Sequence, residues 1–192
     1  WLWVVFMVVV AAETEKRRAP EVPGLRTTVF LAIGGSAAVA LAVVFGFQIL
    51  ELTPVTVVVT AGITIGNTMP STVLASDLVV SYLQDNRLQI EGLLALGFDE
   101  KGASQFLVRT TSRTALIPQI ERTKVVGLIA LPGAMTGLLL AGVEPIDAVI
   151  VQLVVMYLVL AAVVVAVLVV VTTISRRAFT PDLRLEPWTV RT

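Results

Sequence analysis

Residues 148–175 read AVIVQLVVMYLVLAAVVVAVLVVVTTIS, a run of 28 residues without Asp, Glu, Lys or Arg. A helix needs about 20 apolar residues to cross about 30 Å of hydrocarbon. This run is long enough to cross a bilayer as one helix, and it predicts a membrane protein.

Uncharged runs of similar character lie at 27–50, 52–76 and 125–143. A fifth apolar run, 1–12, is too short to cross the hydrocarbon. Because the chain opens with Trp1 inside this run, we expect a fragment whose N-terminal spans are missing. The alternative is a signal peptide, although no basic segment precedes the run.

The composition supports this class and excludes several others. Of the 192 residues, 56% are hydrophobic and 15% are charged, against about 45–50% and about 25% in soluble domains. The absence of Cys and His excludes a disulfide scaffold, a Cys/His zinc site, haem bound through His, a Cys nucleophile and a Ser-His-Asp triad. The composition also excludes a nucleic-acid-binding protein with a basic face.

The basic residues orient the predicted spans. All 14 Lys and Arg residues fall in three segments: before the second span, between the third and fourth, and after the last. The connections 51–54 and 144–147 contain acids and no base. Since cytoplasmic loops are enriched in Lys and Arg, we expect the long middle segment 77–124 and the tail 176–192 in the cytoplasm. The sequence therefore predicts an all-α, polytopic transmembrane bundle with a helical cytoplasmic loop, forming a single domain over 1–192.

Small and helix-breaking residues interrupt two of the spans. Gly62 and Gly66 form one GxxxG pattern, and Gly133 and Gly137 form another, near Pro70 and Pro132. Small residues at this spacing allow close helix packing, and proline frees backbone carbonyls that must face protein or water. A tight helix crossing and a lining of the transport path both fit. The predicted path residues are Gly62, Gly66, Asn67, Met69, Pro132, Gly133, Met135 and Gly137. The predicted spans contain no formal charge, which argues against a proton relay.

The segment 77–124 has the pattern of a docking loop. Leucines at near-helical spacing predict a helix over 77–96 that continues the third span and ends at Gly97. Asp99 is expected to cap a short second helix, and a third is expected over 109–118. The alternative is an amphipathic helix lying on the bilayer surface.

At these residues the chain resembles a known family. Glu91-Gly92-Leu93 followed by Gly97 matches the Glu and Gly of the Glu-Ala-Ala-x-x-x-Gly loop of ABC-transporter membrane subunits, and departs from it at both alanines. Residues 66–69, 113–118, 124–137 and 141–145 resemble, in the same order, the FetB-type permeases of bacterial iron-export ABC transporters. Related plant membrane subunits are linked to aluminium tolerance.

The resemblance implies a transport subunit rather than an enzyme, one that exports iron or another metal across the bacterial plasma membrane. It implies a homodimer paired with a separate ATPase, which binds ATP and Mg²⁺. The absence of a Gly-x4-Gly-Lys-Ser/Thr loop in this chain agrees with that division. The residues expected to couple to the ATPase are Glu91, Gly97, Phe98, Asp99, Lys101 and Phe106. An ABC permease for another solute, such as an amino acid or a nucleotide sugar, and an ATP-independent transporter are the alternatives.

The metal ligands are not identified by the sequence. Neutral oxygens and thioethers bind a bare hard cation poorly, and the predicted spans offer little else. A weak transient metal path, a chelated or organic substrate, and ligands in the missing spans all remain open.

Overall fold

The computed structural model of the chain describes residues 2–16, 22, 24–128, 133–180, 182 and 184–189. These residues form seven α-helices, one 3-10 helix and one isolated bridge between Phe179 and Leu185. The elements are α1 (Leu2–Lys16), α2 (Leu25–Gly46), α3 (Pro54–Asp85), α4 (Arg87–Ala95), α5 (Glu100–Leu128), α6 (Gly133–Leu140), α7 (Pro145–Arg177) and η1 (Pro187–Thr189). The all-α class predicted from the sequence is confirmed.

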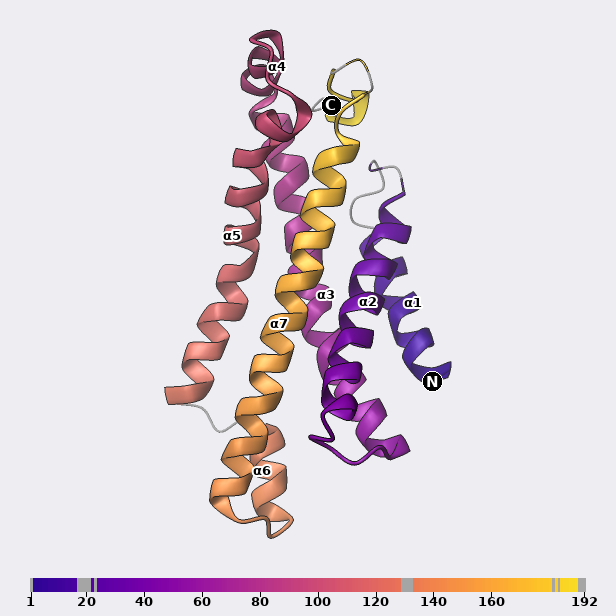
Figure 1. Cartoon of the computed structure of the whole chain (residues 1–192), viewed down its shortest axis with the longest axis vertical. Coiled ribbons are helices and arrows are strands. Elements are labelled where there is room, and N and C mark those ends of the chain that lie inside the picture. The colour runs from indigo at the N-terminus through magenta and orange to yellow at the C-terminus, as the bar shows by residue number, and fades with distance from the viewer. Residues whose placement is uncertain are drawn as a thin grey trace.

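The helices α3 and α7 form the centre of an elongated bundle. Both pack against α2 on one side and α5 on the other, and α1 packs against α2 and α3 (Figure 1). The C-terminal segment and α4 lie at one end of the bundle, and α6 lies at the opposite end. We refer to these as the α4 end and the α6 end.

Three helices in the described part of the chain are long and apolar enough to cross a membrane: α2, α3 and α7. They correspond to the predicted spans 27–50, 52–76 and 148–175. The fourth predicted span, 125–143, is divided between the end of α5, the start of α6 and residues 129–132, which lie outside the described residues. The shorter α1 contains the apolar run at the start of the chain.

Small residues allow the central helices to approach closely. Ala61 and Ala75 of α3 and Ala166 of α7 are fully buried. Four buried hydroxyls of α3 donate to backbone carbonyls of their own helix, as in the bond from Thr64 Oγ1 to the Thr60 carbonyl at 2.8 Å. This satisfies polar groups that would otherwise be costly to bury.

The helix α3 begins at a well-formed cap. The hydroxyl of Thr53 accepts a hydrogen bond from the Thr56 amide at 3.2 Å, and the Thr53 amide donates to the Thr56 hydroxyl at 3.0 Å. Pro54 occupies the first turn, where its missing N–H is not needed.

The prediction of two separate helices after Gly97 is wrong. Residues 100–128 form one helix, α5, with Pro118 in its interior. Every fourth residue of α5 from Ala103 to Gln119 is buried, and the helix packs against α3 and α7 along this face. Tertiary packing therefore overrides the local signals of Pro118 and the polar composition.

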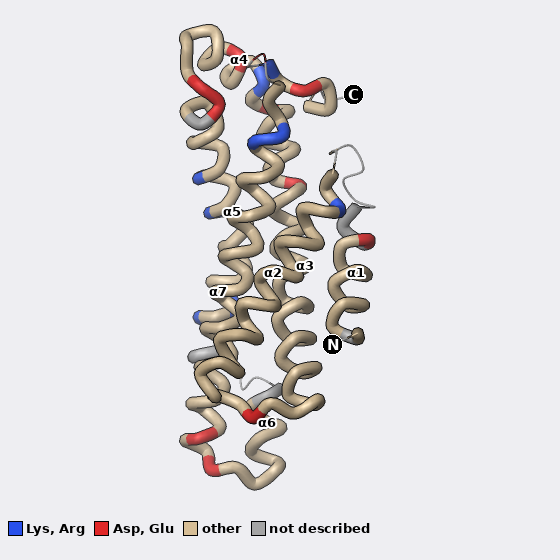
Figure 2. The backbone as a smooth tube through the Cα atoms, turned by 45° about the vertical axis from the view of Figure 1, so that its right-hand side comes forward, with Lys and Arg blue, Asp and Glu red and all other residues tan. Residues whose placement is uncertain are grey.

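Charged residues of α5 lie much deeper in the bundle than the sequence indicated. Arg122 is 22 residues from the start of the 29-residue helix, or about 33 Å at 1.5 Å per residue. Figure 2 shows basic positions along α5, well away from the α4 end. Arg122 and Lys124 consequently lie on a long helix that packs along the bundle, and their side chains are exposed.

Candidate functional site

The turn between α4 and α5 has a defined geometry. The Gly97 amide donates to the Leu94 carbonyl at 3.0 Å, and the Phe98 amide donates to the Leu93 carbonyl at 3.1 Å. With Gly97 at φ +89°, this pair of bonds is a Schellman motif, which favours glycine at the left-handed position. The prediction that Gly97 ends the helix is confirmed.

The start of α5 is held by Asp99. Its Oδ1 accepts a hydrogen bond from the Gly102 amide at 2.7 Å, which confirms Asp99 as a helix cap. One turn further, the Phe106 ring lies beside the Tyr82 ring of α3, with centroids 6.2 Å apart. The Lys101 side chain lies outside the described part of the structure.

Large apolar side chains are exposed around this turn. Leu88 is 85% exposed, Leu96 is 78%, Phe98 is 49% and Phe106 is 66%. We call these four residues the tip surface. Exposed apolar side chains gathered at one site are typical of an interaction surface. Of the six predicted coupling residues, Phe98 and Phe106 belong to this surface.

Glu91 lies on the side of α4 that faces the C-terminal segment. Its Oε1 accepts from Arg87 Nε at 2.8 Å, and Arg87 Nη1 lies 3.4 Å from Thr189 Oγ1. A cavity of about 480 Å³ opens here, lined by Arg87, Glu91, Leu94, Ala95, Asp182, Arg184 and Leu185. The sequence analysis missed this contact between α4 and the tail. The apolar residues of the tail, among them Leu185 and Trp188, were the available signal.

The predicted path residues of α3 do not all face the same helix: Gly62 faces α1, and Asn67 faces α5. Gly62 faces α1, where a Cβ would lie 3.4 Å from Met7 Cε, whereas a Cβ at Gly66 would meet no described atom within 4 Å. Met69 is partly buried against the core. The Asn67 side chain points to α5, and its Oδ1 accepts from Arg122 Nη1 at 2.8 Å.

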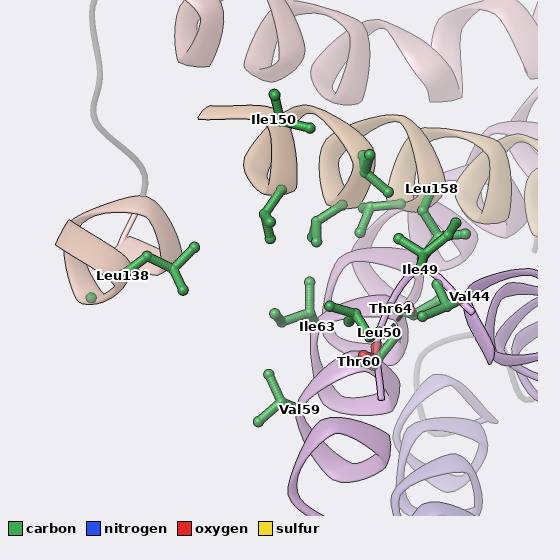
Figure 3. Close-up of a pocket in the computed structure, with 15 residues that line it drawn as sticks. Val44, Ile49, Leu50, Val59, Thr60, Ile63, Thr64, Leu138, Ile150 and Leu158 are labelled. Carbon is green, nitrogen blue, oxygen red and sulfur yellow. Dashed lines mark hydrogen bonds between the residues drawn. The ribbon is translucent and has the colours of Figure 1, made fainter. Parts of the chain in front are cut away.

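The remaining path residues that the structure describes belong to α6. Gly137 and Leu138 of α6 line an apolar cavity of about 420 Å³ together with residues of α2, α3 and α7 (Figure 3). Met135 is half-buried, Gly133 begins α6, and Pro132 lies outside the described residues. Thr60 and Thr64 are the hydroxyl-bearing residues of this lining. The seven predicted path residues that the structure describes are not brought into one site.

No resident metal centre is evident in the described part of the chain, where no three His, Cys, Asp or Glu residues cluster. The described charged residues are distributed unevenly along the bundle. At the α6 end they are the acids Glu51, Glu144 and Asp147, whereas the α4 end carries bases such as Arg87 and Arg184 together with acids such as Glu91 and Asp182 (Figure 2).

Three helices of the described chain are apolar and of spanning length, and the described Lys and Arg residues are absent from the α6 end. These features define a helical membrane protein. A sequence model of the uncharacterised protein family UPF0014 matches residues 1–179. The chain belongs to this family.

Relatives in several organisms are similar to this chain in sequence. The "Probable iron export permease protein FetB" of Escherichia coli (strain K12) is 34% identical over 157 residues, which cover 82% of this chain and 61% of the relative. The "UPF0014 membrane protein STAR2" of Oryza sativa subsp. japonica is 36% identical over 151 residues, covering 79% of this chain and 53% of the relative. "Protein ALUMINUM SENSITIVE 3" of Arabidopsis thaliana is 31% identical over 158 residues, covering 80% of this chain and 58% of the relative.

The chain thus spans between about half and two thirds of these three relatives. No solved structure matches the chain.

Proposed function

We propose that this protein is the membrane-spanning permease subunit of an ABC transporter that exports iron. In this proposal two copies of the permease pair with a separate ATPase, which carries ATP and Mg²⁺ and docks on the tip surface. The observation that carries the proposal is the Schellman turn at Gly97, which presents exposed apolar side chains at the α4 end of a membrane bundle. The printed name of the Escherichia coli relative supports iron as the cargo.

The connection from α4 to the bundle suits the transmission of movement. Asn86 joins α3 to α4, and both its amide and its Nδ2 donate to the Tyr82 carbonyl at 3.0 Å. Ile90 anchors α4 by burial, and α5 returns along both α3 and α7. A displacement of α4 would therefore reach the two central helices through packed contacts. Coupling requires such discrete arrangements rather than a flexible loop.

The charge difference supports an orientation. Lys and Arg are enriched on the cytoplasmic side of membrane proteins, so the proposal places the α4 end and the C-terminus in the cytoplasm of a bacterial cell. An ATPase in the cytoplasm then meets the tip surface directly.

The test is co-purification of the full-length permease with its candidate ATPase. The double variant Leu96→Ser and Phe98→Ser removes exposed apolar groups, so we expect loss of the complex with little effect on folding. The matched control is Leu140→Ser, which removes an 85% exposed leucine at the α6 end. Retention of the complex by the double variant, or equal loss in both proteins, contradicts docking at the tip surface.

A further inference from the structure

A charged residue of α5 lies beside the middle of a membrane-spanning helix. Arg122 Nη1 lies 2.8 Å from Asn67 Oδ1, and the Asn67 Nδ2 donates to the Ile63 carbonyl at 2.7 Å. Asn67 is 13 residues from the start of α3 and 18 from its end, or about 20 and about 27 Å at 1.5 Å per residue. Asn67 therefore holds the Arg122 guanidinium beside the middle of α3.

The half of α5 that includes this residue carries excess positive charge, distributed around the helix rather than on one face. Between 109 and 124 the sequence contains Arg109, Arg113, Arg122 and Lys124 but one acid, Glu121. Glu121 pairs with Lys124 at 2.8 Å. The three arginines are exposed and form no ion pair with any described residue.

The same helix borders a polar cavity near the α4 end. This cavity, of about 650 Å³, lies between α5 and α7, and Gln105, Arg109 and Arg176 line it together with Asp99. Ser175 also lines it; the residue is 1% exposed, and its Oγ has no hydrogen-bond partner among the described residues. A buried hydroxyl without a partner, in a cavity that two arginines also line, fits a ligand that accepts hydrogen bonds.

Lipid is a poor environment for the exposed arginines of α5. Arginine or lysine at the bilayer centre is unfavourable by at least about 2.5 kcal/mol, and intramembrane charges normally face protein or a water-filled cavity. A bare metal cation would be repelled by the excess positive charge, and the described residues provide no acidic cluster to offset it.

We infer that the side of α5 that holds Arg122 against Asn67 lines the transport route for an anionic solute bearing carboxylate or phosphate groups. The cavity at Arg109 is a second binding site for the same solute, near the α4 end. The inference rests on the proposed transport function and refines its substrate. Iron then crosses as a negatively charged chelate rather than as a bare cation.

The test places a thiol one turn beyond Arg122. The sequence has no Cys, so Val125→Cys, at a 47% exposed position, introduces a unique probe into this region of the full-length protein. Two methanethiosulfonate reagents of opposite charge are compared, the 2-sulfonatoethyl and the 2-(trimethylammonio)ethyl forms. The matched control is Val165→Cys, 44% exposed on the apolar α7. Both variants are assayed in lipid vesicles.

We expect the thiol of the Val125→Cys variant to react much faster than that of the Val165→Cys variant, because it faces water. Adding Arg122→Gln to the Val125→Cys background should lower the ratio of anionic to cationic reaction rates about sixfold. This factor follows from Coulomb's law for unit charges ~8 Å apart at a dielectric constant of ~80, acting in opposite directions on the two reagents. Arg122→Lys keeps the charge and should preserve the ratio. Because Arg122→Lys also removes the guanidinium, it shows whether a change in the ratio comes from the lost charge or from disturbed folding.

Two results overturn the inference. Reaction in the Val125→Cys variant no faster than in the Val165→Cys variant means that lipid, another part of the protein or a second copy covers the face. A rate ratio unchanged by Arg122→Gln means that the face is wet but does not attract anions. Neither result depends on the ATPase, so failure of the proposed coupling appears separately, in the co-purification of the tip-surface variants.

Discussion

Gly97→Ala tests the role of the α4–α5 turn without altering any contact. Gly97 has φ +89°, and a Cβ added there meets no described atom within 4 Å, so the strain is confined to the backbone. Left-handed backbone is unfavourable for an L-residue by about 1–2 kcal/mol, and the lower entropy of the unfolded alanine chain offsets about 0.4–1 kcal/mol of this. The net effect is about 1 kcal/mol, or about a fivefold smaller population of the native turn relative to its alternatives.

Gly142→Ala is the matched control. Gly142 has φ +84° with no described neighbour within 4 Å, and its amide and that of Val143 form the same pair of bonds at the end of α6. Both variants should lower the melting temperature by a similar amount, about 2–4 °C per kcal/mol for a chain of this size. They differ in position, since Gly142 lies at the end opposite to the tip surface.

The assay is ATP hydrolysis by the co-purified ATPase in lipid. We expect Gly97→Ala to lower the permease-dependent rate by up to about fivefold, whereas Gly142→Ala leaves it close to that of the unmodified protein. Equal rates in the two variants, at equal loss of stability, would show that the turn does not transmit the movement and would refute this reasoning.

Two further predictions concern the fold. Thr53→Ala removes the cap of α3 and should lower the free energy of unfolding by about 1 kcal/mol, measured by thermal unfolding. Thr53→Ser retains the hydroxyl and should be close to neutral. Equal losses of stability in both variants would argue against the cap. Ala166→Leu forces a larger side chain into a fully buried position of α7 and should destabilise by about 1–3 kcal/mol, whereas Val165→Leu, at an exposed neighbouring position, should not; a stable Ala166→Leu protein contradicts the close packing of α7.

Local signals in the sequence were sufficient where the structure depends on neighbouring residues. Gly97 and Asp99 act through bonds within five residues of themselves, so their types at that spacing predicted the end of α4 and the cap of α5. The spans of α2, α3 and α7 followed from uncharged length alone.

The course of α5 depends on contacts distant in sequence. Its polar composition and Pro118 suggested short, separate helices in a cytoplasmic loop. Every fourth residue is nevertheless buried and packs on α3 and α7, namely Ala103, Leu107, Thr111 and Ala115. That stripe was visible in the sequence and was outweighed by the charges. The pairing of Arg122 with Asn67 joins residues 55 apart and has no local signature.

The most direct test of the proposed function is movement of iron driven by ATP. Full-length permease and its ATPase are reconstituted in proteoliposomes with the ATPase side outward, and iron supplied outside as its citrate chelate is measured inside after addition of ATP and Mg²⁺. The account predicts accumulation that requires ATP, the ATPase and an intact tip surface. Iron that enters at the same rate without ATP or without the ATPase would contradict it, and would identify the protein as an ATP-independent transporter.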